Sequence, residues 1–301
     1  MAIAIIINPV SGGARPDTAR RRAELAADVV ASYGEACEVF VTERRGHARE
    51  LAASAVARGA RLVVAWGGDG TVNEIGSALA FGTTPLAIIP SGSGNGLARE
   101  LGTDRRAERA LGAAIAALGA PARAIDVGEL GGRLFFNVAG VGFDAHVAAC
   151  FDGARGRRGL LSYVRISARE ILRYEPHVYS VTEDGRSSEH RALLLTLANS
   201  AQFGNGAKIA PAAKLDDGRL DLVVFEEQSR IRTIWSAPKL FSGGVAGVPG
   251  LSTRRFGRLT IQCDRPMRFH VDGEPATGGT VLEARVHPGA LRICAQPTRP
   301  T

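Results

Sequence analysis

Short apolar runs alternate with amphipathic stretches through the first part of the chain. The run AIAIII at 2–7 is continuously apolar, which is typical of a parallel-sheet strand covered on both faces. The stretch 17–33 places Val29 and Val30 on one helical face and ends at Gly34. Because strands and helices that alternate in this way form right-handed βαβ units, we predict an α/β domain with a doubly wound parallel sheet. The further predicted strands are 37–42, 61–66 and 85–90, and the further helices are 47–58, 71–80 and 94–101.

After about residue 125 the pattern changes to alternating polar and apolar positions. Asp-Gly turns at 184–185 and 217–218 join these segments, which favours antiparallel β structure. We therefore predict an α/β domain over 1–125 and a β-rich domain over 126–287, and leave open whether 288–301 returns to the first domain. The alternating segments are 134–138, 178–182, 192–198, 220–225, 259–263 and 281–286.

One amphipathic helix is predicted within the β-rich part, over 160–173. Basic and apolar stripes on one helix suit peripheral contact with an anionic membrane surface. A solvated face over a domain core gives the same pattern. The apolar stripe holds Leu160, Val164 and Ile171, and the basic stripe holds Arg165, Arg169 and Arg173.

Composition indicates a globular protein, since 45% of the 301 residues are hydrophobic and 22% are charged. No apolar run approaches the roughly 18 residues of a membrane span, and the start resembles no signal peptide, so we expect a cytoplasmic location. The four cysteines, Cys37, Cys150, Cys263 and Cys294, lie too far apart for a C-x-x-C zinc pair or a disulfide framework. We expect them to be core cysteines.

The charge of the chain suits an anionic partner: a nucleotide, a phospholipid surface or a nucleic acid. The formal net charge is +7, yet residues 1–207 contain no lysine. A Walker A loop and the β3 strand of protein kinases both need a lysine on the phosphates. A nucleotide bound in this part must therefore be held by glycine amides and arginines.

Three glycine-rich turns follow predicted strands and should open at the same edge of the sheet. They are NPVSGG at 8–13, GGDGTVNE at 67–74 and PSGSGNG at 90–96. Glycine lets the backbone approach a phosphate, and the helices that begin near Thr71 and Asn95 direct N–H groups at it. Together the turns predict an anion cradle, whereas tight turning alone would also explain the glycines. The Rossmann G-x-G-x-x-G, the G-x-S-x-G elbow and H-E-x-x-H are missing from the sequence.

Two acidic motifs point to catalysis. Asp69 lies inside the second glycine turn, where phosphates would repel a carboxylate unless a cation intervened, so we predict a magnesium-linked acid. Asp272 and Glu274 flank Gly273 in a predicted hairpin and could supply a base for a substrate hydroxyl group. A turn with solvated acids is the alternative.

Together these motifs resemble the diacylglycerol kinase catalytic-domain family of bacterial lipid kinases and sphingosine kinases. NAD kinases and phosphofructokinases carry turns similar to GGDGT, but PSGSGN and the late DGE separate the lipid kinases from them. The resemblance implies an ATP- and magnesium-dependent lipid kinase with a nucleotide-binding α/β domain and an antiparallel β-sandwich domain that takes the lipid. It rests, in order, on 8–13, GGDGTVNEI at 67–75, PSGSGN at 90–95 with Leu97-Ala98, Asp217-Gly218 with Leu220-Asp221, and Asp272-Gly273-Glu274.

The resemblance also implies roles for individual residues. Asp69 would organise the magnesium ion. Asp272 or Glu274 would take the proton from the lipid hydroxyl group, and we favour Asp272 slightly. The implied nucleotide contacts are Asn8, Pro9, Val10, Ser11, Gly12, Thr42, Gly67, Gly68, Asp69, Gly70, Thr71, Val72, Asn73, Gly92, Ser93, Gly94 and Asn95.

A structural magnesium ion is implied near the Asp217-Gly218 turn. It would be held by Asp217 and the carbonyl groups of Lys214 and Arg219, whereas the same turn could simply close a hairpin. Asp126 matches an acid that is linked through water to the catalytic metal in some relatives, or is a hinge residue.

The acceptor lipid and the partners stay partly open. Gly96 stands where many diacylglycerol kinases have aspartate and some sphingoid-base kinases have a small residue, so we predict a diacylglycerol-like or sphingoid-like lipid. Asp144 is a candidate contact to a polar headgroup. We expect no nucleic-acid partner and leave the oligomeric state open. The alternatives are an NAD kinase-like enzyme for a soluble substrate and a non-catalytic nucleotide-binding regulator.

Overall fold

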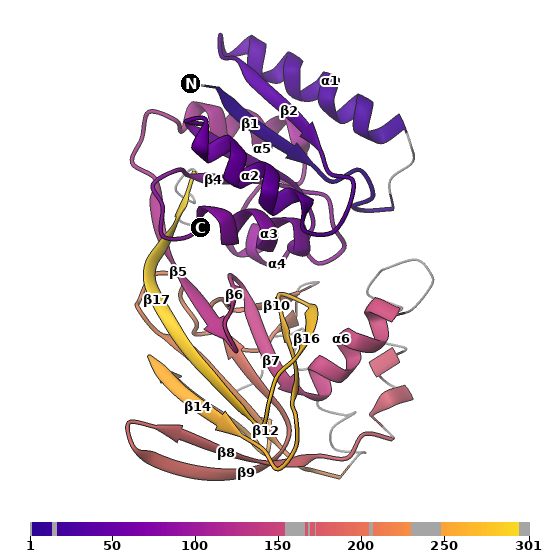
Figure 1. The fold of residues 1–301 in the computed structure, drawn as a ribbon, viewed down its shortest axis with the longest axis vertical. Coiled ribbons are helices and arrows are strands. Elements are labelled where there is room, and N and C mark those ends of the chain that lie inside the picture. The colour runs from indigo at the N-terminus through magenta and orange to yellow at the C-terminus, as the bar shows by residue number, and fades with distance from the viewer. Residues whose placement is uncertain are drawn as a thin grey trace. The chain divides into compact units, whose positions relative to one another are not determined.

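The computed structural model describes residues 2–13, 17–153, 166–167, 169–171, 173–204, 207–229 and 248–294 (Figure 1). The chain forms two compact units. Unit 1 comprises Met1–Ile125 and Gly289–Thr301, and unit 2 comprises Asp126–Pro288. The boundaries fall within two strands, β5 (Arg123–Leu130) and β17 (Val281–Ile293).

Unit 1 contains a parallel sheet in which the strands follow the order β4-β3-β1-β2. In this register Ile5 lies opposite both Val39 and Val64, and the end of β17 adds Ile293 beside Leu86. The strands are β1 (Ile3–Ile7), β2 (Cys37–Val41), β3 (Leu62–Gly67) and β4 (Leu86–Pro90), and the helices are α1 (Asp17–Ser32), α2 (His47–Ala57), α3 (Asp69–Leu79), α4 (Gly96–Glu100) and α5 (Ala107–Ala116).

Helices cover both faces of this sheet, which explains why its strands are apolar throughout. Helices α1 and α5 pack together over Ile3, Ile5 and Ile7 of β1, and α2 packs with α3. Every residue of β1 and β3 is buried. Truncating a side chain such as Ile5 to alanine should cost about 2–5 kcal/mol. The predicted doubly wound parallel sheet is confirmed.

Unit 2 is built from antiparallel strands, as the alternating pattern predicts. Its path runs β16-β15-β7-β9-β8-β14-β17, with β12 joining β9 to β13 and β6 paired with β5. Phe135, Tyr179 and Phe256 lie in one buried cluster between the strands. The elements are β6 (Arg133–Phe135), β7 (Val138–Gly142), α6 (Phe143–Gly153), β8 (His177–Glu183), β9 (Arg186–Ala198), β10 (Gln202–Gly204), β11 (Ala207–Lys208), β12 (Leu220–Glu226), β13 (Leu251–Phe256), β14 (Arg258–Gln262), β15 (Arg268–Val271) and β16 (Glu274–Thr277).

Two Asp-Gly pairs make two-residue hairpin turns of the kind that this dipeptide favours. Asp184 and Gly185 have φ values of 48° and 75°, and Asp272 and Gly273 have 48° and 83°. Aspartate tolerates the left-handed region and glycine enters it without strain. The second turn therefore brings Glu274 to the first position of β16.

Two helices of the structure, α5 and α6, were not predicted from the sequence. In α6 the polar and apolar residues are not clearly divided between two faces, so the pattern that marks an amphipathic helix is weak there. Most of the helix predicted over 160–173, including Leu160, Val164 and Arg165, lies outside the described residues. None of the helices in the described ranges is long and apolar enough to cross a membrane.

Candidate functional site

The three glycine turns of unit 1 lie together at the carboxyl ends of β1, β3 and β4. The N–H of Asn8 donates to the carbonyl of Trp66 (2.9 Å), and the N–H of Ser91 donates to the carbonyl of Gly67 (2.9 Å). The N–H of Thr42, which follows β2, donates to the carbonyl of Ile7 (2.9 Å). The turns therefore begin in register at one edge of the sheet.

Backbone packs directly against backbone where these turns meet. A Cβ atom on Gly92 would lie 2.6 Å from the Cα of Gly68, and one on Gly12 would overlap the carbonyl oxygen of Ser91. Gly12 also has a φ of 76°, which favours glycine. The sequence interpretation assigned the glycines to the approach of a phosphate. The structure adds a second reason, because side chains here would force the turns apart.

Asp69 joins the second glycine turn to the third. Its Oδ2 accepts a hydrogen bond from the N–H of Asn95 (2.8 Å) and its Oδ1 accepts one from the N–H of Gly96 (2.7 Å). These N–H groups open helix α4, so the carboxylate caps that helix. Burial raises the pKa of Asp69 above its usual range, although the two N–H donors oppose the shift. Each oxygen keeps a further lone pair, so Asp69 suits magnesium by its chemistry.

Polar side chains also connect the turns. The Oγ atoms of Ser11 and Ser91 lie 2.6 Å apart, and Nδ2 of Asn8 donates to Oγ1 of Thr71 (2.9 Å). Val10 points into solvent with 74% of its surface exposed. The structure brings together Asn8, Ser11, Gly12, Gly67, Gly68, Asp69, Thr71, Gly92, Gly94 and Asn95 from the predicted set.

Val72 is among the predicted nucleotide contacts, and its side chain lies inside unit 1. It is 6% exposed and faces the interior from helix α3. Its N–H donates to the carbonyl of Gly68 (3.0 Å), the first hydrogen bond of that helix. Val72 therefore anchors the start of the helix rather than offering a side chain to a ligand.

Arg22 is a residue that the sequence reasoning missed. Its Nη1 donates to the carbonyl of Asn8 (2.9 Å) and to Oγ of Ser11 (3.0 Å), and its guanidinium carbon lies 5.7 Å from the ring centre of Trp66. Burial lowers the pKa of Arg22. The available sequence signal was that Arg22 lies four residues, about one helical turn, before Ala26, which is buried on helix α1. Arg22 brings positive charge to the first glycine turn, where lysine is lacking.

In unit 2, the Asp272 carboxylate holds the turn between β15 and β16. Its Oδ2 accepts the N–H of Phe136 (2.9 Å), and its Oδ1 accepts those of Asn137 (2.9 Å) and Val138 (3.1 Å). In return, the N–H of Asp272 donates to the carbonyl of Val138 (2.8 Å). Asp272 therefore fastens the turn to the segment before β7, while Glu274 follows half-buried on the strand.

A buried polar chain lies beneath the same turn. The N–H of Gly273 donates to Nδ1 of His270 (3.3 Å), which places the ring proton on Nε2. Nε2 lies 3.3 Å from Oδ2 of Asp144, which also accepts from Oγ1 of Thr196 (3.2 Å). Asp144 and His270 are each 3% exposed. Asp144 therefore supports the turn through His270. No local sequence pattern indicates this arrangement.

The predicted structural metal site lies at the Asp217-Gly218 turn. Oδ1 of Asp217 accepts the N–H of Arg219 (3.1 Å), and Oδ2 lies 3.4 Å from Nη1 of Arg255. Oδ2 of Asp126 accepts the N–H of Gly218 (2.7 Å). The oxygen donors suit magnesium, and a cation bound there would share the Asp217 carboxylate with Arg255. Asp126 braces the turn, and Lys214 is exposed.

Two family models match different parts of the chain. Residues 2–130 match the model of the diacylglycerol kinase catalytic domain. Residues 137–295 match the model of the YegS C-terminal NAD kinase beta sandwich-like domain. The second match alone covers more than half of the chain.

Individual proteins give the same assignment. The chain is 32% identical over 260 residues to the Pseudomonas fluorescens protein named "Probable lipid kinase YegS-like", covering 85% of this chain and 84% of the relative. It is 32% identical over 254 residues to the diacylglycerol kinase of Mycobacterium tuberculosis, covering 82% and 80%.

Solved structures from Bacillus anthracis share the fold. A diacylglycerol kinase structure has a TM-score of 0.71 at 20% identity and covers 98% of this chain and 97% of its own. Another solved chain from the same organism has a TM-score of 0.78 at 22% identity, covering 98% of this chain and 95% of its own. The resemblance seen in the sequence is confirmed: the chain belongs to the diacylglycerol kinase catalytic-domain family of lipid kinases.

Proposed function

We propose that this protein transfers the γ-phosphoryl group of ATP to a hydroxyl group of a diacylglycerol-like or sphingoid-like lipid. The observation that carries the proposal is the contact among the three glycine turns, with Asp69 hydrogen-bonded from one turn into the next. Such a surface presents N–H groups with little side-chain bulk, which suits phosphate oxygens. Family membership supports the lipid as acceptor.

Unit 1 would bind the nucleotide phosphates. The N–H groups of the turns and of the helix that begins after Gly68 would donate to phosphate oxygens. Arg22 would add positive charge through the first turn, to which it is hydrogen-bonded. Asp69 would hold the magnesium ion, which supplies charge neutralisation at the transferring phosphoryl group.

Unit 2 would supply the base, and the contacts favour Glu274 over Asp272. The Asp272 carboxylate already accepts three backbone N–H groups, so a proton there would break the bonds that fix the turn. Glu274 would accept the proton of the lipid hydroxyl group as its oxygen bonds to the γ-phosphorus and the bond to ADP breaks. This reverses the slight preference for Asp272 that the sequence alone suggested.

His270 and Asp144 would position this base without touching the substrate. His270 receives the N–H of Gly273, the residue before Glu274, and Asp144 fixes the ring of His270. Asp144 is too deeply buried in the described structure, at 3% exposure, to meet a lipid headgroup directly. We therefore assign it to support of the turn instead.

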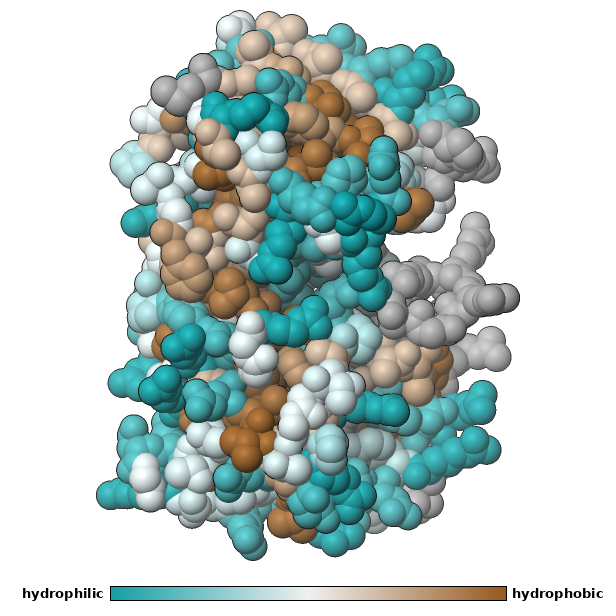
Figure 2. Space-filling model, in the orientation of Figure 1, coloured by the Kyte–Doolittle hydropathy of each residue, from teal (hydrophilic) through white to brown (hydrophobic). Residues whose placement is uncertain are grey.

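Peripheral contact with an anionic membrane is part of the proposal. Arg169 and Arg173 are exposed in the described residues and each would gain about 1 kcal/mol near an anionic surface. On the face shown in Figure 2, hydrophilic residues cover much of the surface, and hydrophobic residues form smaller areas among them. Reversing both arginines to glutamate should weaken binding to anionic vesicles while activity on a short-chain, water-soluble lipid persists. Equal loss on both substrates would remove the membrane role.

The proposal is tested by incubating the protein with γ-labelled ATP, magnesium, NAD and vesicles that carry diacylglycerol, a sphingoid base or a total lipid extract. We expect label in a lipid product, and about 10²–10⁴-fold slower labelling in Glu274→Gln if that residue is the base. Label on NAD but on no lipid would identify a soluble-substrate kinase. Binding of ATP without transfer to any acceptor would identify a nucleotide-binding regulator.

A further inference from the structure

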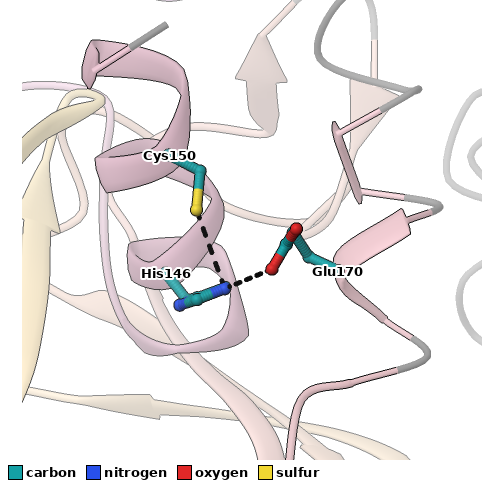
Figure 3. A group of neighbouring side chains, drawn as sticks. All are labelled: His146, Cys150 and Glu170. Atoms are coloured by element: carbon teal, nitrogen blue, oxygen red, sulfur yellow. Dashed lines mark hydrogen bonds and ion pairs between the residues drawn. The ribbon is translucent and has the colours of Figure 1, made fainter.

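Three side chains with different metal-binding atoms meet beside helix α6. Nε2 of His146 lies 2.9 Å from Oε2 of Glu170 and 3.7 Å from Sγ of Cys150. One ligand atom from each residue lies within 4.8 Å of the other two, and all three residues are half-buried. Figure 3 shows the sulfur and the carboxylate both directed at the same nitrogen of the ring.

Local structure explains why these residues converge. His146 and Cys150 are four residues apart, so they share one face of α6. Glu170 approaches from a separate segment, whose Ile171 is buried in the same cluster as Phe143 and Val147 of α6. The ring of Tyr174 packs against that of His146 at 5.5 Å between centres. The backbones that carry the cluster are therefore held by apolar packing, independently of the polar contacts.

The spacing of the ligand atoms resembles the edges of a tetrahedral site. Zinc bonds of roughly 2.0–2.1 Å to nitrogen and oxygen and about 2.3 Å to sulfur place N and S about 3.6 Å apart and N and O about 3.3 Å apart. The observed N···S distance is 3.7 Å, and the observed N···O distance is 2.9 Å. A small outward rotation of Glu170 would therefore admit an ion among the three atoms.

We propose that His146, Cys150 and Glu170 bind a divalent ion of the zinc type, with water as the fourth ligand. Nitrogen, thiolate and carboxylate donors together are typical of zinc and its neighbours, whereas magnesium and calcium prefer oxygen alone. A neutral imidazole and two anions balance the charge of a divalent ion. The site is separate from the magnesium that would accompany ATP.

Binding of the ion at this site requires the loss of one proton, from the thiol. On binding, the Cys150 thiol releases its proton to solvent, and the His146 ring carries its proton on Nδ1 so that Nε2 can donate its lone pair. Oε1 of Glu170 lies 3.6 Å from Nε of Arg169, which leaves Oε2 as the single ligand oxygen. Burial, followed by the charge of Glu170, raises the pKa of the Cys150 thiol, and a bound cation would offset both effects.

The competing explanation is an ion pair between His146 and Glu170 with Cys150 as a bystander. The experiment uses the full chain after removal of metal by a chelator and dialysis. Zinc is titrated against a chromophoric chelator, and cobalt(II) is added separately as a spectroscopic probe. Cys150→Ser is compared with the wild type, and Cys37→Ser is the matched control, because Cys37 is also half-buried but lies in unit 1.

We expect one tightly bound zinc per chain, and a thiolate-to-cobalt charge-transfer band in the wild type and in Cys37→Ser. Cys150→Ser should abolish the band and weaken zinc binding by about 100-fold or more, since loss of a hydrogen-bond partner of a metal ligand alone costs about 10–100-fold. Wild-type protein that binds no stoichiometric zinc or shows no charge-transfer band would overturn the proposal. So would undiminished zinc affinity in Cys150→Ser. A wild-type spectrum without the band overturns the proposal even if the variant fails to fold.

Discussion

In unit 1 backbone packs directly against backbone where the glycine turns meet, in addition to side-chain hydrogen bonds such as those of Asp69, whereas in unit 2 the Asp272–Gly273 turn is held mainly by polar side chains. A side chain at Gly92 would overlap Gly68, so the turns of unit 1 can meet only because these positions are glycine. The turn of unit 2 instead requires specific side-chain acceptors, because Asp272 accepts three N–H groups and His270 accepts a fourth.

The two arrangements suit the two proposed tasks. Phosphate oxygens need several N–H donors at close range, which side chains would obstruct. A base needs one carboxylate held at a defined place, which hydrogen bonds to a rigid sheet provide. We therefore expect unit 1 to be most sensitive to added atoms and unit 2 to removed hydrogen-bond acceptors.

The largest effect on stability is expected from Asp272→Ala. It leaves three backbone N–H groups without their acceptor, each worth about 1–3 kcal/mol when unpaired. Denaturant unfolding should show a loss of about 3 kcal/mol or more. Glu274→Ala, two residues away, should cost less than about 1 kcal/mol as an ordinary half-buried substitution. Similar losses in both variants would contradict the assignment of Asp272 to the turn.

Adding one methyl group at Gly94 tests the opposite sensitivity of unit 1. Its Cβ would lie 2.5 Å from Oδ2 of Asp69, a strain of about 1–3 kcal/mol. The ATP concentration for half-maximal rate should rise about tenfold or more, since about 1.4 kcal/mol corresponds to a factor of ten. Gly119→Ala is the control, because a Cβ there meets nothing within 4 Å. Equal ATP dependence in both variants would place the nucleotide elsewhere.

The pH dependence of nucleotide binding follows from Asp69. Burial raises the pKa of this carboxyl above the ordinary value of 3.8, so as the pH falls the proton returns earlier than it would to an exposed aspartate. Only the charged form attracts magnesium. As the pH is lowered, the affinity for magnesium-ATP, measured by calorimetry, should therefore begin to fall while the pH is still above 3.8. Asp69→Asn should not show this fall. A decline of the same size in Asp69→Asn would assign the titration to another group.

The smallest effect is expected from Thr196→Val. It removes one hydrogen bond to Asp144 (3.2 Å) and keeps the side-chain volume, so the free energy of unfolding should fall by about 1 kcal/mol. If Asp144 positions the turn, kcat should fall modestly while the ATP requirement stays unchanged. A raised ATP requirement would instead link this chain of contacts to the nucleotide.

Local patterns predicted many of the elements of both units and the residues that close two of their turns. Continuous apolar runs predicted β1, β3 and β4 because a strand covered on both faces has no polar side. The Asp-Gly pairs at 184–185 and 272–273 predicted hairpin turns because few residues adopt positive φ. Helix α5 was not predicted, although its buried residues Ala110, Leu111, Ala114 and Ile115 recur at helical spacing and were an available signal.

Contacts between distant segments could not be predicted. Asp272 accepts N–H groups from residues about 135 positions earlier, and Arg22 reaches the first glycine turn from a helix. The sequence interpretation treated all four cysteines as core residues, because zinc patterns were sought as C-x-x-C. The spacing of His146 and Cys150 on one helical face was the available signal, but Glu170 joins them only in the folded chain.

The central claim is that Glu274 is the base and Asp272 holds the turn. It is tested most directly by the rate of phosphoryl transfer from labelled ATP to vesicle lipid, at saturating ATP, in Glu274→Gln and Asp272→Asn. We predict that Glu274→Gln lowers kcat by about 10²–10⁴-fold with unchanged unfolding. Asp272→Asn keeps one oxygen that can accept N–H groups, and its side chain tolerates positive φ. This variant should reduce the free energy of unfolding, and its loss of kcat should be smaller than that of Glu274→Gln. A near-normal kcat in Glu274→Gln, or the larger loss of kcat in Asp272→Asn, would contradict the account.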